Sequence, residues 1–391
     1  MKVLIITNLF PNNRQPGRGI FNQQQFRELA QMCELKIIAP LPWCPRFLSR
    51  WDNCAQVPDK EMIDGIEVFH PRYLVTPKIG RSFYGYFLYL GIIPTIKKVA
   101  QSFSFDIILA TWAYPDAFAG MLTAKHFKKP LVIKVHGSDV NLFSKYFWRR
   151  LMMRRAFEHS QKVIAVSSEL KEKIQHLGIL EDKIAVIGNG VNTHIFKPME
   201  KNECRKKLAL PLEPKLVVFI GNLVEVKGIE FLITAFRDLR DDITLRIVGE
   251  GGLQSKLEKQ VRELNLSRRI VFTGRCPHMD IPVWMNAADI FCLPSLNEGC
   301  PNVVLEALAC GTPVVASRVG GIPDMITSPG QGILTAPRDS KGLAQAIDTL
   351  ITKVNSKQKG EAILKRSWSD TAREVHQVLT QALHCSNVPP P

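Results

Sequence analysis

The 391-residue sequence lacks several features that mark particular classes of protein. It has no run of about 18 apolar residues, so no membrane-spanning helix is expected. The hydrophobic stretch before Asn8 is too short for a secretory signal, which favours a cytoplasmic protein. The nine cysteines include no Cys-x-x-Cys pair, which argues against a zinc or disulfide framework. The absence of Gly-x-Gly-x-x-Gly after residues 3–7 disfavours a nicotinamide-dependent oxidoreductase.

The charge of the chain is unevenly distributed. The formal net charge is +15, and the first 200 residues hold 27 Lys and Arg against 16 Asp and Glu. Such an excess indicates an anionic partner, which could be nucleic acid, a phosphorylated small molecule or an anionic lipid surface. Hydrophobic residues make up 46% and charged residues 22%, as in ordinary globular proteins.

Apolar runs typical of β-strands alternate with helical patterns along the whole chain, which predicts an α/β fold with parallel sheets. This alternation of strands and helices stops at a turn-rich linker, residues 188–198, and starts again at residue 216. We therefore expect two doubly wound domains that face a central cleft, where the carboxyl ends of their strands would bind ligands. The expected domains are residues 1–190, residues 191–367, and a tail, residues 368–391, whose helix crosses back to the first domain.

The segment from Ser295 to Ser317 carries the most chemical information. Pro301 suits the first position of a helix and Gly311 the position after its last turn. Glu298 then precedes the helix and Glu306 lies within it, with the amides of residues 299–302 between them. Two carboxylates beside a helix N-terminus suit a polyhydroxyl ligand that carries phosphate. A capping glutamate and an incidental helical glutamate would give the same pattern.

Three weaker motifs follow predicted strands. Lys227-Gly228 opens a helix after the strand 216–220, as a diphosphate clamp would, although a solvated lysine fits equally. Gly17-Arg18-Gly19 precedes a helix and lets backbone approach a phosphate. His136 follows the strand 131–135 at the edge that faces the expected cleft, where a structural histidine is the common alternative.

Four segments occur in the order and domains in which family 4 glycosyltransferases carry them. They are Glu298-x7-Glu306, residues 221–228, residues 136–139 and residues 188–192. On these segments the chain resembles that family of retaining, GT-B-fold enzymes with nucleotide-sugar donors, over roughly residues 2–385. Within the family it is most similar to transferases of teichuronic-acid-type surface polysaccharides.

The resemblance implies roles for individual residues. Glu306 would hold the ribose hydroxyls, Glu298 would contact the donor sugar, and Lys227 would bind the diphosphate and stabilise it as it leaves. His136 would lie beside the donor sugar near the reacting carbon, and Gly19 near the donor phosphates. Further donor contacts would come from Gly299, Cys300, Pro301 and Asn302, mostly through backbone, and from Arg275 near the nucleobase. The implied catalytic residues are His136, Lys227 and Glu298.

One position departs from the family pattern. Many members have Arg where this chain has Asn222, which brings no charge, so the diphosphate would depend more on Lys227 and helix amides. The implied reaction is transfer with retention at the anomeric carbon and without a metal or other cofactor. The chain has no Asp-x-Asp metal motif, which agrees with a protein-supplied positive field in place of Mg²⁺.

The resemblance leaves several alternatives. A nucleotide-sugar epimerase or a glycogen-synthase-type glucan polymerase could use the same architecture. A nucleic-acid-binding protein would explain the charge, but the basic residues match no known nucleic-acid motif, and the paired glutamates would repel phosphates. Two aromatic stretches near basic residues, 83–93 and 145–155, suit peripheral contact with an anionic membrane, as at the inner face of the cell membrane. A core helix and a solvated basic helix would also explain them.

Overall fold

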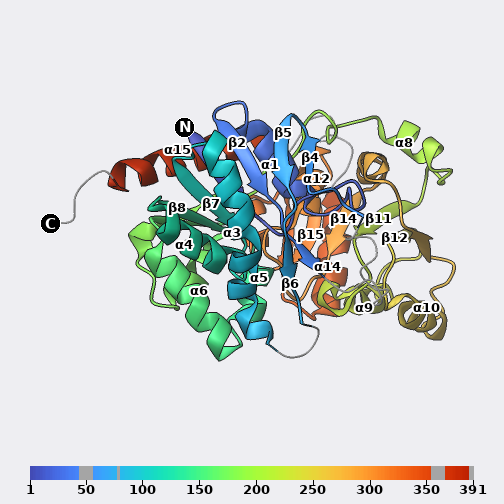
Figure 1. The fold of residues 1–391 in the computed structure, drawn as a ribbon. Coiled ribbons are helices and arrows are strands. Elements are labelled where there is room, and N and C mark those ends of the chain that lie inside the picture. The colour runs from blue at the N-terminus through green and yellow to red at the C-terminus, as the bar shows by residue number, and fades with distance from the viewer. Residues whose placement is uncertain (44–55, 77–79, 354–365, 387–391) are drawn as a thin grey trace. The chain divides into compact units, whose positions relative to one another are not determined.

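The chain folds into two compact units (Figure 1). The computed structural model describes residues 1–43, 56–76, 80–353 and 366–386. Unit 1 comprises Met1–Asn189 and Trp368–Pro391, and unit 2 comprises Gly190–Ser367. Each unit has its own sheet and its own apolar core.

An eight-stranded sheet forms the centre of unit 1, in the order β10-β9-β8-β7-β1-β2-β5-β4. The strands are β1 (Lys2–Ile6), β2 (Glu34–Ile38), β4 (Lys60–Ile63), β5 (Ile66–Phe69), β7 (Ile107–Thr111), β8 (Leu131–Val135), β9 (Lys162–Ala165) and β10 (Ile184–Val186). A separate parallel pair consists of β3 (Leu41–Trp43) and β6 (Arg72–Leu74). Because β1 pairs with both β2 and β7, the strand order reverses between β1 and β7. Open α/β sheets bind ligands at such a reversal.

Helices cover both faces of this sheet. The helices of unit 1 are α1 (Ile20–Leu29), η2 (Arg81–Phe83), α3 (Tyr84–Ser102), α4 (Asp116–Phe127), α5 (Ser138–Phe143), α6 (Phe147–His159), α7 (Ser168–Gln175), η3 (Glu181–Lys183) and α15 (Trp368–Ser386). The C-terminal helix α15 packs on α1, and apolar residues of both helices share one core with β1 and β2. Helix α4 contacts α3, α6, β7 and β8. Helix α15 is thus part of unit 1.

One strand differs from the all-parallel expectation. β4 runs antiparallel to β5 at the edge of the sheet. The two strands are joined by Asp64-Gly65, both with positive φ, of 51° and 77°. An Asp-Gly pair with left-handed backbone at both positions favours a tight two-residue hairpin, so this turn signal was present in the sequence.

A six-stranded, all-parallel sheet forms the centre of unit 2, in the order β13-β12-β11-β14-β15-β16. The strands are β11 (Lys215–Ile220), β12 (Ile243–Val248), β13 (Ile270–Gly274), β14 (Ile290–Leu293), β15 (Val314–Ser317) and β16 (Gly332–Thr335). Numbered within the unit, this order is 3-2-1-4-5-6, the arrangement of the Rossmann fold. The order reverses between β11 and β14, so the loops after these two strands flank the expected ligand crevice.

Most helices of unit 2 connect these parallel strands. The helices are α8 (Lys201–Lys207), η4 (Glu225–Lys227), α9 (Ile229–Ala235), α10 (Gln254–Glu263), η5 (His278–Asp280), α11 (Ile281–Ala287), α12 (Asn302–Ala309), α13 (Ile322–Met325) and α14 (Ser340–Lys353). Helix α8 precedes the first strand and α14 follows the last. Almost all residues of β11, β14 and β15 are buried, as expected for strands covered by helices on both faces.

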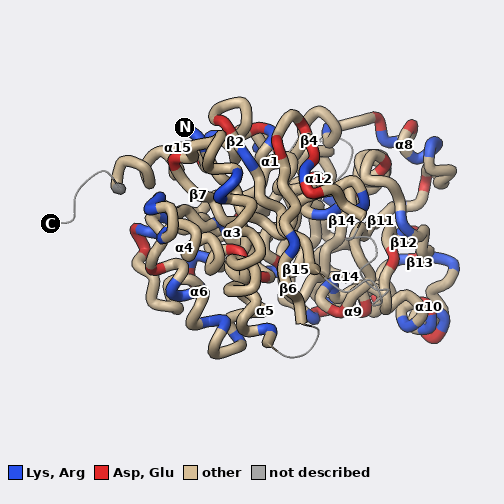
Figure 2. Tube along the Cα trace, in the orientation of Figure 1, with Lys and Arg blue, Asp and Glu red and all other residues tan. Residues whose placement is uncertain are grey.

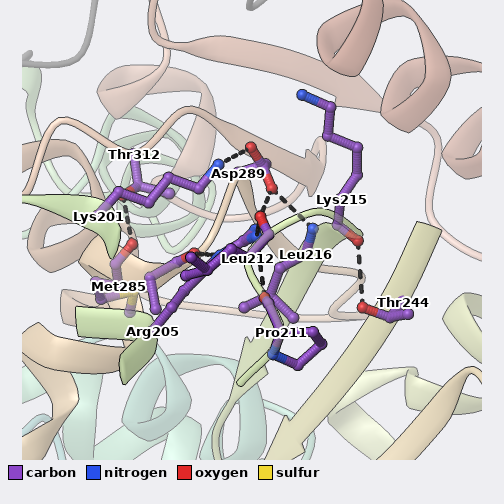
Figure 3. A network of polar contacts seen from close by, with 11 residues as sticks. Lys201, Arg205, Pro211, Leu212, Lys215, Leu216, Thr244, Met285, Asp289 and Thr312 are labelled. Carbon is purple, nitrogen blue, oxygen red and sulfur yellow. Dashed lines mark hydrogen bonds and ion pairs between the residues drawn. The ribbon is translucent and has the colours of Figure 1, made fainter. Parts of the chain in front are cut away.

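A buried ionic network fixes the start of the two central strands of unit 2 (Figure 3). The Asp289 carboxylate pairs with Lys201 and, at 2.8 Å, with Arg205, and it accepts the backbone N–H of Leu216 at 2.8 Å. The almost fully buried Arg205 guanidinium also donates to the carbonyls of Ala287 and Leu212. Helix α8 is therefore tied to β11 and β14, the strands that lead to the candidate site.

Candidate functional site

The loops after β11 and β14 bring together Lys227 and Glu298. Lys227 ends the short helix η4 after β11, and its Nζ lies 2.6 Å from Glu298 Oε1. The Ser295 hydroxyl donates to the same oxygen at 2.7 Å. Both charged side chains are mostly buried, with 21% and 12% exposed. Because the strand order reverses between β11 and β14, this ion pair lies at the position where open α/β sheets bind ligands.

Glycines let the backbones of these loops approach closely. Gly228 has φ 60°, and a Cβ there would lie 2.2 Å from the carbonyl oxygen of Pro294. Gly320, with φ 59°, would place a Cβ 2.2 Å from the carbonyl oxygen of Glu298. The backbone of Leu296 donates to Val226 at 2.8 Å. Only glycine combines left-handed backbone with such close approach, so these residues fix the position of the Lys227–Glu298 pair.

Helix α12 begins one residue later than expected. Asn302 is its first residue, and Pro301 is the N-cap, with φ −72° and ψ 108°. Pro301 has no N–H, so it can offer only its carbonyl and ring to a ligand. Gly311 follows the helix with φ 74°, which suits the position expected for it. Glu306 lies in the middle of the helix, about one turn from its first residue, and is almost buried.

Glu306 faces a histidine that the sequence analysis did not single out. The Nε2 of His278 lies 3.7 Å from Glu306 Oε1, and the ring meets Phe196 edge-on at 5.5 Å. The facing carboxylate of Glu306 raises the pKa of His278 above its ordinary value, against the opposing effect of burial. The pair can therefore hold the Glu306 carboxylate in one orientation. No local sequence signal connects the two residues, because η5 and α12 meet only in the fold.

We expect His278→Gln to lower stability only at low pH. A raised pKa means that the ion pair stabilises the fold fully below the unfolded pKa of His and loses its contribution as pH rises through the folded pKa. The effect should stay below about 1 kcal/mol because the imidazole is partly exposed to solvent. Melting temperatures of both proteins, compared from acid to alkaline pH, measure it. A difference that does not change with pH would contradict the ion pair.

Two further predicted residues of unit 2 are exposed. Asn222 lies directly after β11 on the loop that leads to Lys227. Arg275 follows β13; its side chain is 79% exposed and pairs with Glu250 at 3.6 Å. Among the described residues, neither Asn222 nor Arg275 forms a side-chain hydrogen bond or ion pair with Lys227, Glu298 or Glu306. The structure thus leaves the suggested contacts of both residues with a donor as predictions.

Unit 1 places Gly19 and His136 at the carboxyl ends of its strands. Gly19 is the N-cap of α1 with φ 65°, and a Cβ there would lie 2.3 Å from the carbonyl oxygen of Leu9. His136 directly follows β8. The ring of Phe21, two residues after Gly19, packs on the imidazole with centroids 4.8 Å apart. Both predicted residues therefore belong to one edge of the sheet in unit 1.

His136 is held as a neutral imidazole. Burial, with the positive charge of Lys134, lowers its pKa well below the ordinary value. Its backbone N–H donates to the Asp139 carboxylate at 3.1 Å, and the indole of Trp112 stacks at 6.1 Å. Its buried Nε2 has no hydrogen-bond partner among the described residues. His136 can therefore exchange a hydrogen bond with a ligand, but it does not supply a positive charge near neutral pH.

Asp116 lies at the strand-order reversal of unit 1 and was missed from the sequence. Its Oδ2 accepts the backbone N–H of Asn8 at 2.7 Å, while its buried Oδ1 has no partner among the described residues. Burial raises the pKa of Asp116 well above its ordinary value. The side-chain oxygen Oδ1 of Asn22 is likewise buried and unpartnered. The only local signal was a carboxylate in the first turn of a helix that follows a strand.

The described residues contain no helix that is long and apolar enough to cross a membrane. In the same part of the chain, no group of three or more His, Cys, Asp or Glu side chains is placed to hold a metal ion.

Two family models match the two halves of the chain. Residues 23–195 match the model described as Glycosyltransferase Family 4, and residues 200–373 match the model described as Glycosyl transferases group 1. The chain is 32% identical to the putative teichuronic acid biosynthesis glycosyltransferase TuaC of Bacillus subtilis, over 89% of this chain and 88% of that protein. A GDP-mannose-dependent alpha-(1-6)-phosphatidylinositol monomannoside mannosyltransferase of Mycolicibacterium smegmatis is 26% identical over 89% of each chain.

Solved structures resemble the whole chain. HepE of Anabaena in complex with UDP and glucose superposes with a TM-score of 0.71 at 22% identity, covering 97% of this chain and 99% of that one. A sucrose-phosphate synthase of Thermosynechococcus elongatus gives 0.75 at 21% identity, covering 98% and 97%. At this level of identity the likeness establishes the fold.

Proposed function

Because the chain belongs to glycosyltransferase family 4 and has the GT-B fold, with two Rossmann-like domains, we propose the following reaction. It transfers a hexosyl group from a nucleotide-diphosphate sugar to a saccharide or lipid-linked saccharide acceptor, with retention and without a metal. The Lys227–Glu298 ion pair at the strand-order reversal of unit 2 carries this proposal. Such a crevice is where Rossmann-like sheets bind nucleotides.

The donor would bind along the loops after β11 and β14. Glu306 would accept the two ribose hydroxyls, and Glu298 would accept hydroxyls of the donor sugar. Lys227 would place its ammonium group against the diphosphate. Gly299, Cys300 and Asn302 would offer backbone to the sugar and phosphate near the start of α12, and Pro301 its carbonyl. Because the Lys227–Glu298 pair already exists in the protein alone, the charge that meets the diphosphate is preorganised.

Transfer would proceed on one face of the donor sugar. The acceptor oxygen forms a bond to the anomeric carbon on the face from which the diphosphate departs, and the bond from that carbon to the phosphate oxygen breaks. The leaving phosphate oxygen takes the acceptor proton. Lys227 would stabilise the negative charge that grows on the diphosphate in the transition state. This arrangement accounts for retention with the residues of the chain alone.

The residues of unit 1 would complete the site on the sugar side. Neutral His136 would donate a hydrogen bond to the donor sugar near its reacting carbon, and Gly19 would let backbone approach the donor phosphates. The unpartnered oxygens of Asp116 and Asn22 would accept hydroxyl groups of a saccharide acceptor. The proposal requires that the two units contribute to one site when the substrates are bound.

Relatives support the choice of substrates. HepE is described in complex with UDP-glucose, TuaC is described in teichuronic acid biosynthesis, and the mycobacterial relative acts on a phosphatidylinositol mannoside. We therefore propose that the chain acts in surface polysaccharide synthesis in the cytoplasm, at the inner face of the membrane. The excess of positive charge on the chain would then attract the anionic donor and the anionic membrane rather than nucleic acid.

A two-stage experiment tests this function. Uridine, guanosine and adenosine diphosphate sugars are first screened by thermal shift, since a ligand of the folded state raises the melting temperature. The stabilising donor, radiolabelled in its sugar, is then incubated with saccharide acceptors, and the product's anomeric configuration is determined by NMR. We expect a single retained linkage in the presence of chelator. An epimerised sugar without acceptor would indicate an epimerase, and a long glucan would indicate a polymerase; either result would contradict the proposal.

A further inference from the structure

An exposed apolar surface lies where α5 ends and α6 begins. Leu142, Tyr146, Phe147 and Trp148, here called the aromatic patch, are each between 53% and 61% exposed. The Phe147 and Trp148 rings pack edge to face at 5.3 Å. Large apolar side chains exposed together in this way mark an interaction surface rather than ordinary surface variation.

Basic residues outnumber acidic residues around the aromatic patch in the sequence. Residues 140–157 contain five Lys and Arg and no Asp or Glu. Figure 2 shows this basic character along α6. The Arg149 guanidinium lies over the ring of Tyr146, 4.5 Å from its centroid. Lys145, Arg150 and Arg155 are exposed. Arg154 pairs with Glu158 at 2.7 Å, so the surface combines aromatic side chains with a net excess of positive charge.

The opposite side of α6 is anchored in unit 1. Met153, Ala156 and Phe157 are fully buried, and α6 packs on α4. The helix has only 13 residues, so it can lie along a membrane surface but cannot cross a bilayer. Tyrosine and tryptophan are favoured at the headgroup level, and basic residues are attracted to anionic lipids. An in-plane helix with both features is typical of peripheral membrane proteins.

We propose that the aromatic patch and its basic rim dock unit 1 onto an anionic lipid surface. The charge complementarity favours lipid over an apolar protein partner. The exposed aliphatic Leu142 and the mutual packing of Phe147 and Trp148 favour lipid over nucleic acid, whose bases stack on free ring faces. Helix α5 starts two residues after His136, so the docked surface adjoins the edge of the unit 1 sheet at which His136 lies. The docking itself does not depend on the proposed function. Only the further step, that a lipid-linked acceptor would reach this edge of the sheet, rests on it.

Vesicle sedimentation without substrates tests the docking. The full chain is mixed with vesicles of phosphatidylcholine and phosphatidylglycerol, or of phosphatidylcholine alone, at low salt. We expect binding to the anionic vesicles only. Arg150→Gln with Arg155→Gln should weaken partitioning roughly 25-fold, about fivefold per basic residue. Phe147→Ser with Trp148→Ser should reduce it by about tenfold or more.

A matched control separates the patch from the net charge. Lys256→Gln with Arg262→Gln removes the same charge from exposed positions on α10 of unit 2, away from both aromatic stretches in the sequence. We expect this variant to bind almost like the unmodified chain. Equal weakening by both charge variants, no binding to anionic vesicles, or equal binding to both lipids would overturn the proposal. So would a dimer that dissociates on Phe147→Ser with Trp148→Ser, because the patch would then hold a second copy. Since no donor is present, each failure leaves the transferase proposal untouched.

Discussion

Replacing Lys227 with alanine is expected to lower kcat by about 10²–10³-fold, the usual cost of losing one preorganised electrostatic contact to the transition state. The ammonium group would matter most as the diphosphate departs, so turnover should fall even with saturating donor. The free energy of unfolding should fall by about 1–3 kcal/mol, because Glu298 stays mostly buried without its cation while Ser295 still donates to it. Steady-state kinetics and chemical denaturation measure the two effects.

The control for this experiment is a lysine outside the site. Lys256 is exposed on α10 of the same unit, so Lys256→Ala removes an equal charge without touching the loop after β14. Its kcat should remain close to that of the unmodified chain. Near-normal turnover of Lys227→Ala under saturating donor would reject the role of Lys227 as the group that stabilises the leaving diphosphate.

Replacing Gly320 with alanine is expected to destabilise unit 2 and displace Glu298. The left-handed φ of 59° alone costs a residue with a Cβ about 1–2 kcal/mol. The new Cβ would also lie 2.2 Å from the Glu298 carbonyl oxygen, so one of the two backbones must shift. We expect the free energy of unfolding to fall by about 2 kcal/mol or more. A displaced Glu298 should also lower kcat/KM by about 10²-fold.

Gly252→Ala is the matched substitution for this test. Its Cβ would meet no atom within 4 Å, and its backbone φ lies outside the left-handed region. Chemical denaturation of the two variants and the unmodified chain should therefore separate close packing from the general effect of a glycine replacement. If Gly320→Ala were as stable and active as Gly252→Ala, the close approach of Gly320 to Glu298 would not constrain the site.

The sequence was sufficient to predict the α/β fold because buried parallel strands are short, continuous apolar runs. β8 and β11 lie within a residue of their expected ranges for this reason. The loops that precede two helices could also be predicted, since Gly228 and Gly19 adopt left-handed backbone that other residues adopt poorly. The antiparallel β4 was missed because the pattern of apolar residues does not indicate strand direction. The Asp64-Gly65 turn between β4 and β5 did indicate a hairpin, and therefore an antiparallel pair.

The contacts of the candidate site could be predicted only in part. The resemblance placed Lys227 and Glu298 in one site, but their ion pair depends on the pairing of β11 with β14, which no local pattern encodes. His278 and Asp116 lay outside the motifs, and their partners come from other elements of the fold. The neutral state of His136 likewise follows from burial and from Lys134, which only the structure shows.

The proposed donor site of unit 2 holds a nucleotide-diphosphate sugar between Lys227, Glu298 and Glu306. Calorimetric titration of the best-stabilising donor into the unmodified chain and into Glu306→Gln tests it most directly, with the exposed Glu263→Gln on α10 as the control. The account predicts that Glu306→Gln weakens Kd by about tenfold or more, the loss of charge-assisted hydrogen bonds to the ribose, while Glu263→Gln binds normally. An unchanged Kd for Glu306→Gln, or no binding of any nucleotide-diphosphate sugar to the unmodified chain, would contradict it.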